Sequence, residues 1–239
     1  VSALALGLAS LHLGKPLKAW RSFLGWRKSW FSREVIVFSM FVPLIGAAIL
    51  ASEKSELFIA LKITSAVIGI LGVACSAMIY VDTHREFWRA SQCFGKFFGT
   101  TFLLGASVAV VAQAFANSGK NSIGVIFAFL FAATVVKFGF EQRIARHLVD
   151  ENSITLTPLN KTARLLADKL GLASRLRILC GIFGSIVLPI VFITNLSGGA
   201  VYPSVTIAAL ILSLAGELLE RYLFFTAVST VKMPGNVIA

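Results

Sequence analysis

Long apolar runs separated by short basic segments dominate this chain. Most of these runs are near or above the roughly 17 to 25 residues that an α-helix needs to cross a bilayer. Turn residues at 195–203 divide the longest run into spans at 178–195 and 203–226. Inside a bilayer every backbone N–H and C=O group needs a hydrogen-bond partner within the protein. Apolar runs of this length form those hydrogen bonds as α-helices, whereas barrel strands are shorter and alternate apolar with polar residues. The uncharged runs cover residues 1–14, 35–51, 63–81, 97–119, 121–136 and 178–216.

The pattern therefore predicts an all-α, polytopic transmembrane helical bundle with seven spans, which we treat as one membrane domain over residues 1–239. The first run is short and already apolar at Val1. It has neither the basic start nor the cleavage pattern of a signal peptide. We interpret it as an incomplete span and expect one more upstream, which gives eight spans in the full chain.

Composition agrees with this fold class. The chain is 57% hydrophobic and 14% charged, with a mean hydropathy of +0.84. Soluble domains carry nearly twice that share of charged residues. These values exclude an ordinary soluble domain and indicate an integral membrane protein.

Basic residues lie almost entirely on one side of the predicted spans. All Lys and Arg except Lys54, Lys62 and Lys120 fall in the loops 15–33, 82–97 and 137–177 or near the C-terminus. This asymmetry orients a helical bundle with its basic loops in the cytoplasm. It also explains the pI of 10.0 without a nucleic-acid partner. Anionic lipid or a docked protein is compatible with the same face.

Two features of this basic side predict contact with the membrane surface. The four tryptophans, Trp20, Trp26, Trp30 and Trp88, fall there and form an interfacial aromatic belt, or one of them binds a flat aromatic headgroup. Residues 157–171 begin with a Thr-Pro pair and end at a Gly, and their Leu and basic residues alternate at helical spacing. This pattern predicts an amphipathic interfacial helix, or a ledge for a soluble subunit.

Few groups in the chain can carry redox chemistry. The three cysteines lack a CxxC spacing, which leaves no ligand set for an iron–sulfur cluster. The three histidines lie at span ends or in loops, which disfavours an intramembrane haem. We therefore expect no metal site in this chain. The GlyIleLeuGly sequence at 69–72 indicates close helix packing.

Proton-handling groups are concentrated at the first hairpin. His12 ends the first run and Glu34 opens the next, so both lie at the basic surface. His12 can instead be an ordinary interfacial histidine, and Glu34 can be a carboxylate stabilised by a helix dipole. Near the other end, Glu217 and Arg221 are spaced to form an i,i+4 pair that stabilises the last helix. Ionisable groups in spans are functional candidates, and Lys137, Glu141 and Glu220 are further examples.

Three sequence motifs resemble the DmsC family, the membrane anchor subunits of dimethyl sulfoxide reductase-type molybdoenzymes. They are the segment 9–22, which contains HisLeuGlyLysPro at 12–16, the sequence SerArgGluVal at 32–35, and the segment 215–225, which contains GluLeuLeuGluArg at 217–221. The segment 80–88 is similar to a loop of that family more loosely, and from it only Tyr80 and Arg85 are carried over. The order and spacing of the motifs match from residue 1 to about 232.

The resemblance implies a haem-free anchor in a bacterial or archaeal cytoplasmic membrane, bound to an iron–sulfur subunit and a molybdopterin catalytic subunit. It implies that His12 and Glu34 accept protons in the oxidation of menaquinol or another quinol. The types of residue fit this role, since imidazole and a partly desolvated carboxylate both transfer protons near neutral pH. Supporting residues would be Lys15, Pro16, Arg21, Tyr80, Arg85, Glu217 and Arg221.

Two other interpretations stay open from the sequence. A secondary transporter would show inverted repeats, broken helices and charged groups at mid-membrane. A purely structural anchor would keep the sequence motifs but would no longer oxidise quinol at a degenerate quinone site.

Overall fold

The computed structural model describes residue 20 and residues 23–51, 55–116, 120–148, 157–196 and 203–229. Six helical segments in this part of the chain are long and apolar enough to cross a membrane. They confirm the helical membrane bundle and six of its seven predicted spans, while the predicted span 1–14 lies outside the described residues. The six segments are Trp30–Leu50, Glu56–Val81, Ala90–Phe115, Ile123–Gln142, Gly171–Thr194 and Pro203–Thr226.

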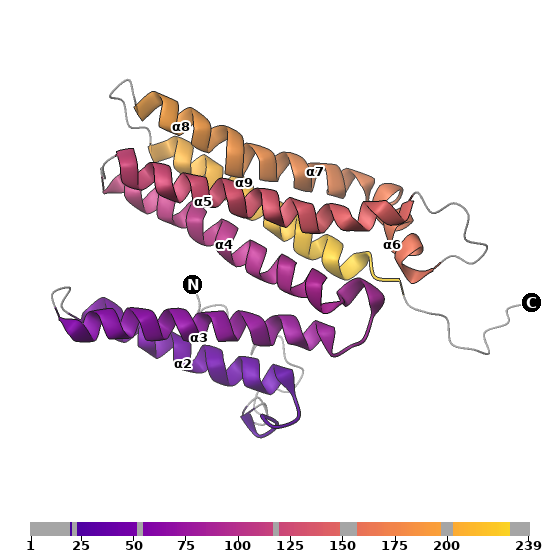
Figure 1. Cartoon of the computed structure of the whole chain (residues 1–239), viewed down its shortest axis with the longest axis horizontal. Helices are drawn as coiled ribbons and strands as arrows, with labels where there is room; N and C mark the ends of the chain where they lie inside the picture. Colours follow the sequence, from indigo (N-terminus) through magenta and orange to yellow (C-terminus); the bar gives the residue numbers. More distant parts are fainter. Residues whose placement is uncertain are drawn as a thin grey trace, which may run out of the picture. The chain divides into compact units, whose positions relative to one another are not determined.

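The chain divides into two compact units, one ending at His84 and the other beginning at Arg85 (Figure 1). The single domain over 1–239 stays a prediction. In the first unit, α2 (Trp30–Leu50) and α3 (Glu56–Val81) pack along each other. A Cβ atom at Gly72 would lie 2.8 Å from the Phe38 ring of α2, and one at Gly69 would lie 3.0 Å from the Phe41 ring. These contacts confirm that the GlyIleLeuGly sequence serves helix packing.

The second unit is a bundle built on four antiparallel spans. α4 (Ala90–Phe115) packs on α5 (Lys120–Gln142) and on α9 (Pro203–Thr226), and α9 also packs on α7 (Gly171–Ile182). A π-helical segment, η4 (Phe183–Val187), joins α7 to α8 (Leu188–Leu196). Short 3₁₀ segments η2 (Glu86–Trp88) and η3 (Arg143–Leu148) lie at the ends of α4 and α5.

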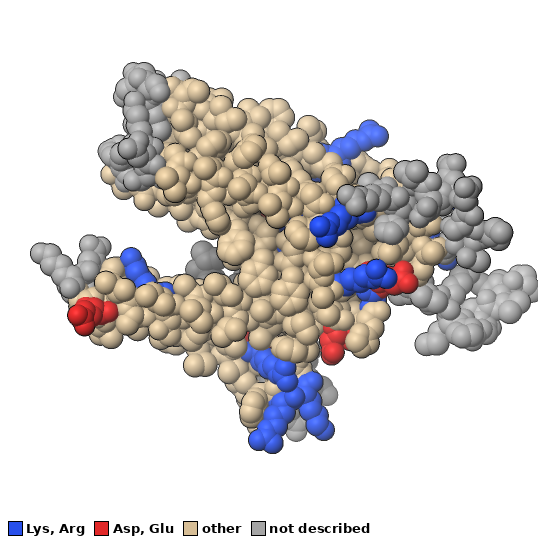
Figure 2. Space-filling view, in the orientation of Figure 1, with Lys and Arg blue, Asp and Glu red and all other residues tan. Residues whose placement is uncertain are grey.

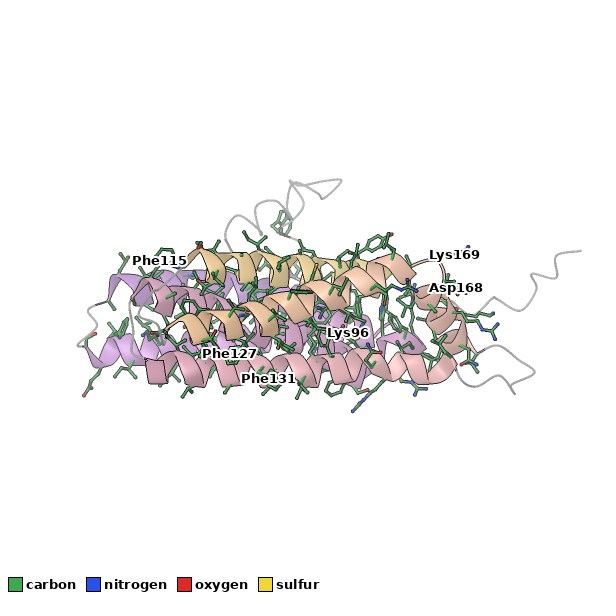
Figure 3. The ribbon with its side chains drawn as sticks, turned by 90° about the horizontal axis from the view of Figure 1, so that it is seen from above. Lys96, Phe115, Phe127, Phe131, Asp168 and Lys169 are labelled. Atoms are coloured by element: carbon green, nitrogen blue, oxygen red, sulfur yellow. The ribbon has the colours of Figure 1, made fainter. Side chains whose placement is uncertain are left out.

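The outer faces of the spans are apolar and exposed, as lipid contact requires. Ile49 of α2 is 77% exposed and Val125 of α5 is 71% exposed. In the second unit, Figure 2 shows Lys and Arg atoms gathered toward one end of the helices, with tan surface along the rest. Phe115 lies at the opposite end of this unit from Asp168 and Lys169, and Phe131 points outward (Figure 3). An apolar belt of this kind is what a bilayer solvates.

The predicted amphipathic helix is present but shorter than expected. α6 spans Pro158–Ala167, with the Thr157 side chain accepting a hydrogen bond from the Asn160 N–H as its N-cap. The prediction that the helix extends to Gly171 is wrong, because the chain turns at 168–170 and Gly171 begins α7. α6 packs on η2, η3 and α7 and buries Asn160, Thr162 and Ala163. Its position in the membrane interface stays a prediction.

Several spans begin earlier or end later than the uncharged runs. α2 begins at Trp30 rather than at 35, and α4 begins at Ala90 rather than at 97. α5 continues to Gln142, beyond Lys137 and Glu141. The boundaries differ because charged side chains near these ends lie inside helices, where they are paired.

Candidate functional site

Glu34 lies in the second turn of α2, not at its first turn. The helix begins at Trp30 with Ser29 as N-cap, whose side chain accepts from the Ser32 N–H. No acidic residue occupies the first turn. Since the helix dipole acts mainly on the first turn, it does not account for Glu34.

The Glu34 carboxylate is held instead by the neighbouring helix. Ser76 of α3 donates a hydrogen bond from its Oγ to Glu34 Oε1, and the same Oγ lies 3.1 Å from the Gly72 carbonyl oxygen. Glu34 is half-buried between the two helices. A carboxylate in this position is partly removed from water while one of its oxygens has a fixed partner.

Arg33 shapes the chain just before this carboxylate. Its Nε donates to the Trp26 carbonyl at 2.9 Å, and its Nη2 donates to the Arg27 carbonyl at 3.0 Å. Its guanidinium carbon also lies 4.2 Å from the centre of the Trp30 ring. The described end of the basic loop is therefore folded back onto the start of α2.

The other predicted site residues divide into two groups. His12, Lys15, Pro16 and Arg21 lie outside the described residues, so their pairing with Glu34 stays a prediction. Tyr80 follows Ser76 by one helical turn, on the same side of α3, and is half-buried. Arg85 belongs to the second unit, where its guanidinium lies 4.8 Å from the Trp88 ring.

Trp88 does not belong to an interfacial belt. It is 8% exposed, its ring stacks on Phe224 at 5.4 Å, and its Nε1 donates to the Phe224 carbonyl at 3.2 Å. The belt prediction is therefore wrong for Trp88, which is a core residue of the second unit. Trp20 and Trp26 are more than half exposed, as a belt requires.

A second group of polar side chains lies inside the helices of the second unit, and we name it the ionic cluster. Glu217 of α9 is at its centre: Lys137 Nζ and the Thr100 hydroxyl both contact Oε2, the hydroxyl at 2.5 Å, and Arg177 Nη2 lies 3.0 Å from Oε1. The predicted i,i+4 pair between Glu217 and Arg221 is therefore wrong. The cluster comprises Lys96, Thr100, Lys137, Glu141, Arg177, Glu217, Glu220 and Arg221.

The remaining members extend the cluster toward the basic end of the bundle. Arg177 Nη2 also lies 2.9 Å from Glu141 Oε1. Lys96 Nζ lies 3.1 Å from Glu220 Oε1, and Arg221 Nε lies 3.8 Å from Glu220 Oε2. Figure 3 places Lys96 within the bundle, away from both ends. Lys96 is six residues into α4, or roughly 9 Å along its axis.

Glycines make the space that these long side chains occupy. A Cβ at Gly99 would lie 2.9 Å from Lys137 Cγ. A Cβ at Gly181 would lie 2.6 Å from Arg177 Nη1, and one at Gly216 would lie 3.2 Å from the same atom. The Arg177 guanidinium thus passes between the backbones of α7 and α9.

Sequence reasoning missed four of the residues that complete these sites: Ser76, Lys96, Thr100 and Arg177. Their signal is helical spacing. Lys96, Thr100 and Ser107 lie on one face of α4, and Arg177 precedes Gly181 by one turn on α7. Lys96 and Arg177 each stand directly before an uncharged run. Sequence reasoning therefore placed them at the end of a span and not in its buried interior.

The described residues contain no group of three or more His, Cys, Asp or Glu that could hold a metal ion. Cys75, Cys93 and Cys180 are free thiols. The side chains at Glu34 and in the ionic cluster are carboxylates, hydroxyls and basic groups, which form hydrogen bonds and can transfer protons.

Comparison with known proteins adds family-level information. A family model described as "DMSO reductase anchor subunit (DmsC)" matches residues 4–227. A curated sulfite dehydrogenase subunit from Allochromatium vinosum is 32% identical over 155 residues, which cover 59% of this chain and 46% of that protein. The chain thus spans about half the length of the curated relative it matches. No solved structure matches the chain.

Proposed function

This chain belongs to the DmsC family of DMSO reductase anchor subunits, and on that premise we propose that it contributes a quinol site to a molybdoenzyme complex. In this proposal it lies in the cytoplasmic membrane of a bacterium or archaeon, with its basic loops in the cytoplasm. Its partners are an iron–sulfur subunit, which receives the electrons, and a molybdopterin catalytic subunit. The ligand is menaquinol or another quinol.

The observation that supports the quinol site is the half-buried Glu34 carboxylate, bonded through one oxygen to Ser76 between two apolar helices. Oxidation of a quinol removes two electrons and two protons, so each hydroxyl needs a proton acceptor. Glu34 Oε2 accepts one hydroxyl hydrogen, while His12 accepts from the other hydroxyl. Ser76 holds the carboxylate in place during the transfer.

Substitution of Glu34 tests this assignment in the intact complex. Glu34→Gln removes the proton acceptor and keeps the side-chain shape, so we expect quinol-dependent turnover to fall by about 10²- to 10⁴-fold. Turnover with a dye that reduces the soluble subunits directly should not change. Glu56→Gln, at an exposed position in the first turn of α3, is the matched control. Wild-type quinol oxidation by Glu34→Gln would exclude this role and favour a purely structural anchor.

The name of the curated relative favours a second candidate, in which electrons run in the opposite direction. A dehydrogenase removes electrons from its substrate, and in a complex of that kind this chain would pass those electrons to quinone. In this case Glu34 and His12 deliver protons rather than accept them. Assays of the purified complex with a quinol analogue and with a quinone analogue distinguish the two directions, and co-purification identifies the partner subunits.

A further inference from the structure

A pocket of about 220 Å³ lies in the second unit where α4 begins and α5 ends. Two exposed arginines line it: Arg89, directly before α4, and Arg143, directly after α5. The other lining residues come from η2, the first turn of α4, η3 and the first turn of α6. They are Glu86, Phe87, Ser91, Gln92, Ile144 and Leu159.

Packing of α4 on α5 brings the two arginines to one place. A Cβ at Gly95 of α4 would lie 2.8 Å from the Phe140 ring of α5, so the two helices are in close contact near these ends. From that contact, the start of α4 and the end of α5 continue in the same direction to Arg89 and Arg143. The Arg143 guanidinium carbon lies 4.3 Å from the centre of the Phe140 ring, which supports this side chain at the helix end.

Neither arginine has an acidic partner among the described residues. Every ion pair between described residues belongs to the ionic cluster, and none includes Arg89 or Arg143. Glu86 is the one carboxylate in the lining, so the two guanidinium groups leave the lining net positive. Arg89 is also the N-cap of α4 and makes no side-chain cap hydrogen bond, and the N–H groups at the start of a helix favour an anion. The Ser91 hydroxyl is a further donor. The pocket is therefore suited to an anion.

Its level in the membrane indicates which anion is at hand. Arg89 and Arg143 directly flank two spans, and the ends of spans lie at the depth of the lipid headgroups. Val136, Gly139 and Arg143 follow one another at helical spacing and are all exposed, Val136 at 59%. A lipid-facing apolar surface on α5 therefore leads to a guanidinium. A phospholipid has the same order, with acyl chains in the hydrocarbon and a phosphate at the surface, and arginine binds phosphate through two parallel hydrogen bonds.

We propose that this pocket binds the phosphate of an anionic phospholipid, with Arg89 and Arg143 as its two charged ligands and Ser91 as a further donor. The glycerol part of the lipid contacts the apolar side chain of Leu159. Glu86 opposes binding, because its carboxylate lines the same pocket as the phosphate. The bound lipid joins α4, η3 and α6 at the membrane surface. This proposal does not depend on quinol binding.

Native mass spectrometry of the purified complex, stripped of lipid in detergent, tests the site by titration with phosphatidylglycerol. We expect the double variant Arg89→Gln/Arg143→Gln to bind this lipid roughly 30-fold more weakly at its tightest site. Binding of phosphatidylcholine, which has no net charge, should change far less. Glu86→Gln should bind phosphatidylglycerol more tightly than the wild type. The matched control is Lys161→Gln/Arg175→Gln, which removes the same charge from exposed positions on α6 and α7 outside the pocket lining.

The control distinguishes a site from a general attraction of the basic face. Equal weakening in the two double variants would overturn the proposal, and so would weaker binding by Glu86→Gln. All of these substitutions are at exposed positions, so we expect the complex to stay assembled with an unchanged melting temperature.

Inorganic phosphate separates a lipid site from a site for free phosphate. The lipid-loaded complex is incubated with millimolar phosphate, or with sodium chloride of the same ionic strength, before transfer to the spray solution. Because the lipid gains apolar contacts that free phosphate lacks, both salts should leave the same amount of lipid bound. Displacement by phosphate alone would assign the pocket to free phosphate and overturn the lipid assignment.

Electron cryomicroscopy of the complex in nanodiscs of phosphatidylglycerol locates the ligand. We expect phosphate density between the guanidinium groups of Arg89 and Arg143, with acyl-chain density along α5. A carboxylate of a partner subunit between the two arginines would make the pocket a docking surface for protein and overturn the proposal. A pocket without lipid density would overturn it as well.

Discussion

At the scale of single residues, the two sites place carboxylates in different surroundings. Glu34 has one hydroxyl partner, Ser76, and is half-buried. Glu217 is 2% exposed and is bonded by an ammonium, a guanidinium and a hydroxyl. With both oxygens engaged, Glu217 acts mainly to hold Lys137 and Arg177 in place.

Removal of Lys137 should destabilise the second unit strongly. Lys137→Met leaves the buried Glu217 carboxylate without its closest cation, which costs about 3–5 kcal/mol when one partner of a buried pair is lost. Lys62→Met removes an exposed lysine from α3 and should change stability little. Thermal unfolding of the purified complex in detergent compares the two variants. Equal melting temperatures would show that the ion pair adds no stability.

At the scale of elements, α9 supplies the face on which the second unit is built. Thr206, Ser213, Glu217 and Glu220 are all buried on this helix, and its neighbours approach it closely where they carry small residues. The closest approach is at Gly184 of η4, where an added Cβ would lie 2.6 Å from the Ser213 backbone nitrogen and 2.9 Å from the Ala209 carbonyl oxygen. Backbone atoms cannot move aside as a flexible side chain can.

Gly184→Ala should therefore force η4 and α9 apart. We expect a loss of about 1–3 kcal/mol from overpacking. Gly139→Ala on α5 is the matched control, because a Cβ there meets nothing within 4 Å. An alanine at that position should stabilise its helix by roughly 0.5–1 kcal/mol. Melting temperatures of the two variants should move in opposite directions, and a shared direction would contradict the close contact.

At the scale of the whole molecule, hydropathy was sufficient to predict the helical membrane fold, and the motifs were sufficient to predict the family. Glu34 could be singled out as a candidate because it directly precedes an apolar run, and its role in a quinol site stays a proposal. The ionic cluster could not be predicted, because its members come from four helices far apart in sequence. Lys96 and Arg177 become neighbours of Glu220 and Glu217 only when the bundle forms. A single sequence gives the spacing along one helix, not which helices pack together.

The orientation of the chain is the prediction that belongs to this scale. Asp82 and Glu56 lie at opposite ends of α3 and are both exposed. In a parent without native thiols, Asp82→Cys should be labelled from the cytoplasmic side and Glu56→Cys from the other side, because basic loops stay in the cytoplasm. Membrane vesicles of the two opposite orientations allow both sides to be probed. The reverse pattern would place the basic loops outside the cell.

The π-helical segment η4 has a consequence for how this family can vary in length. A single π turn holds one residue more than the α-helix around it. Deletion of one residue within Phe183–Val187 would return the segment to regular α-helical spacing and leave the residues after it on the same faces relative to α7. Phe192, which is 2% exposed, would then keep its contacts with Ala114 and Ile123. The segment thus absorbs one extra residue without changing which face of the helix is buried, and relatives that lack it should be one residue shorter at this point and keep a buried aromatic residue on the same face.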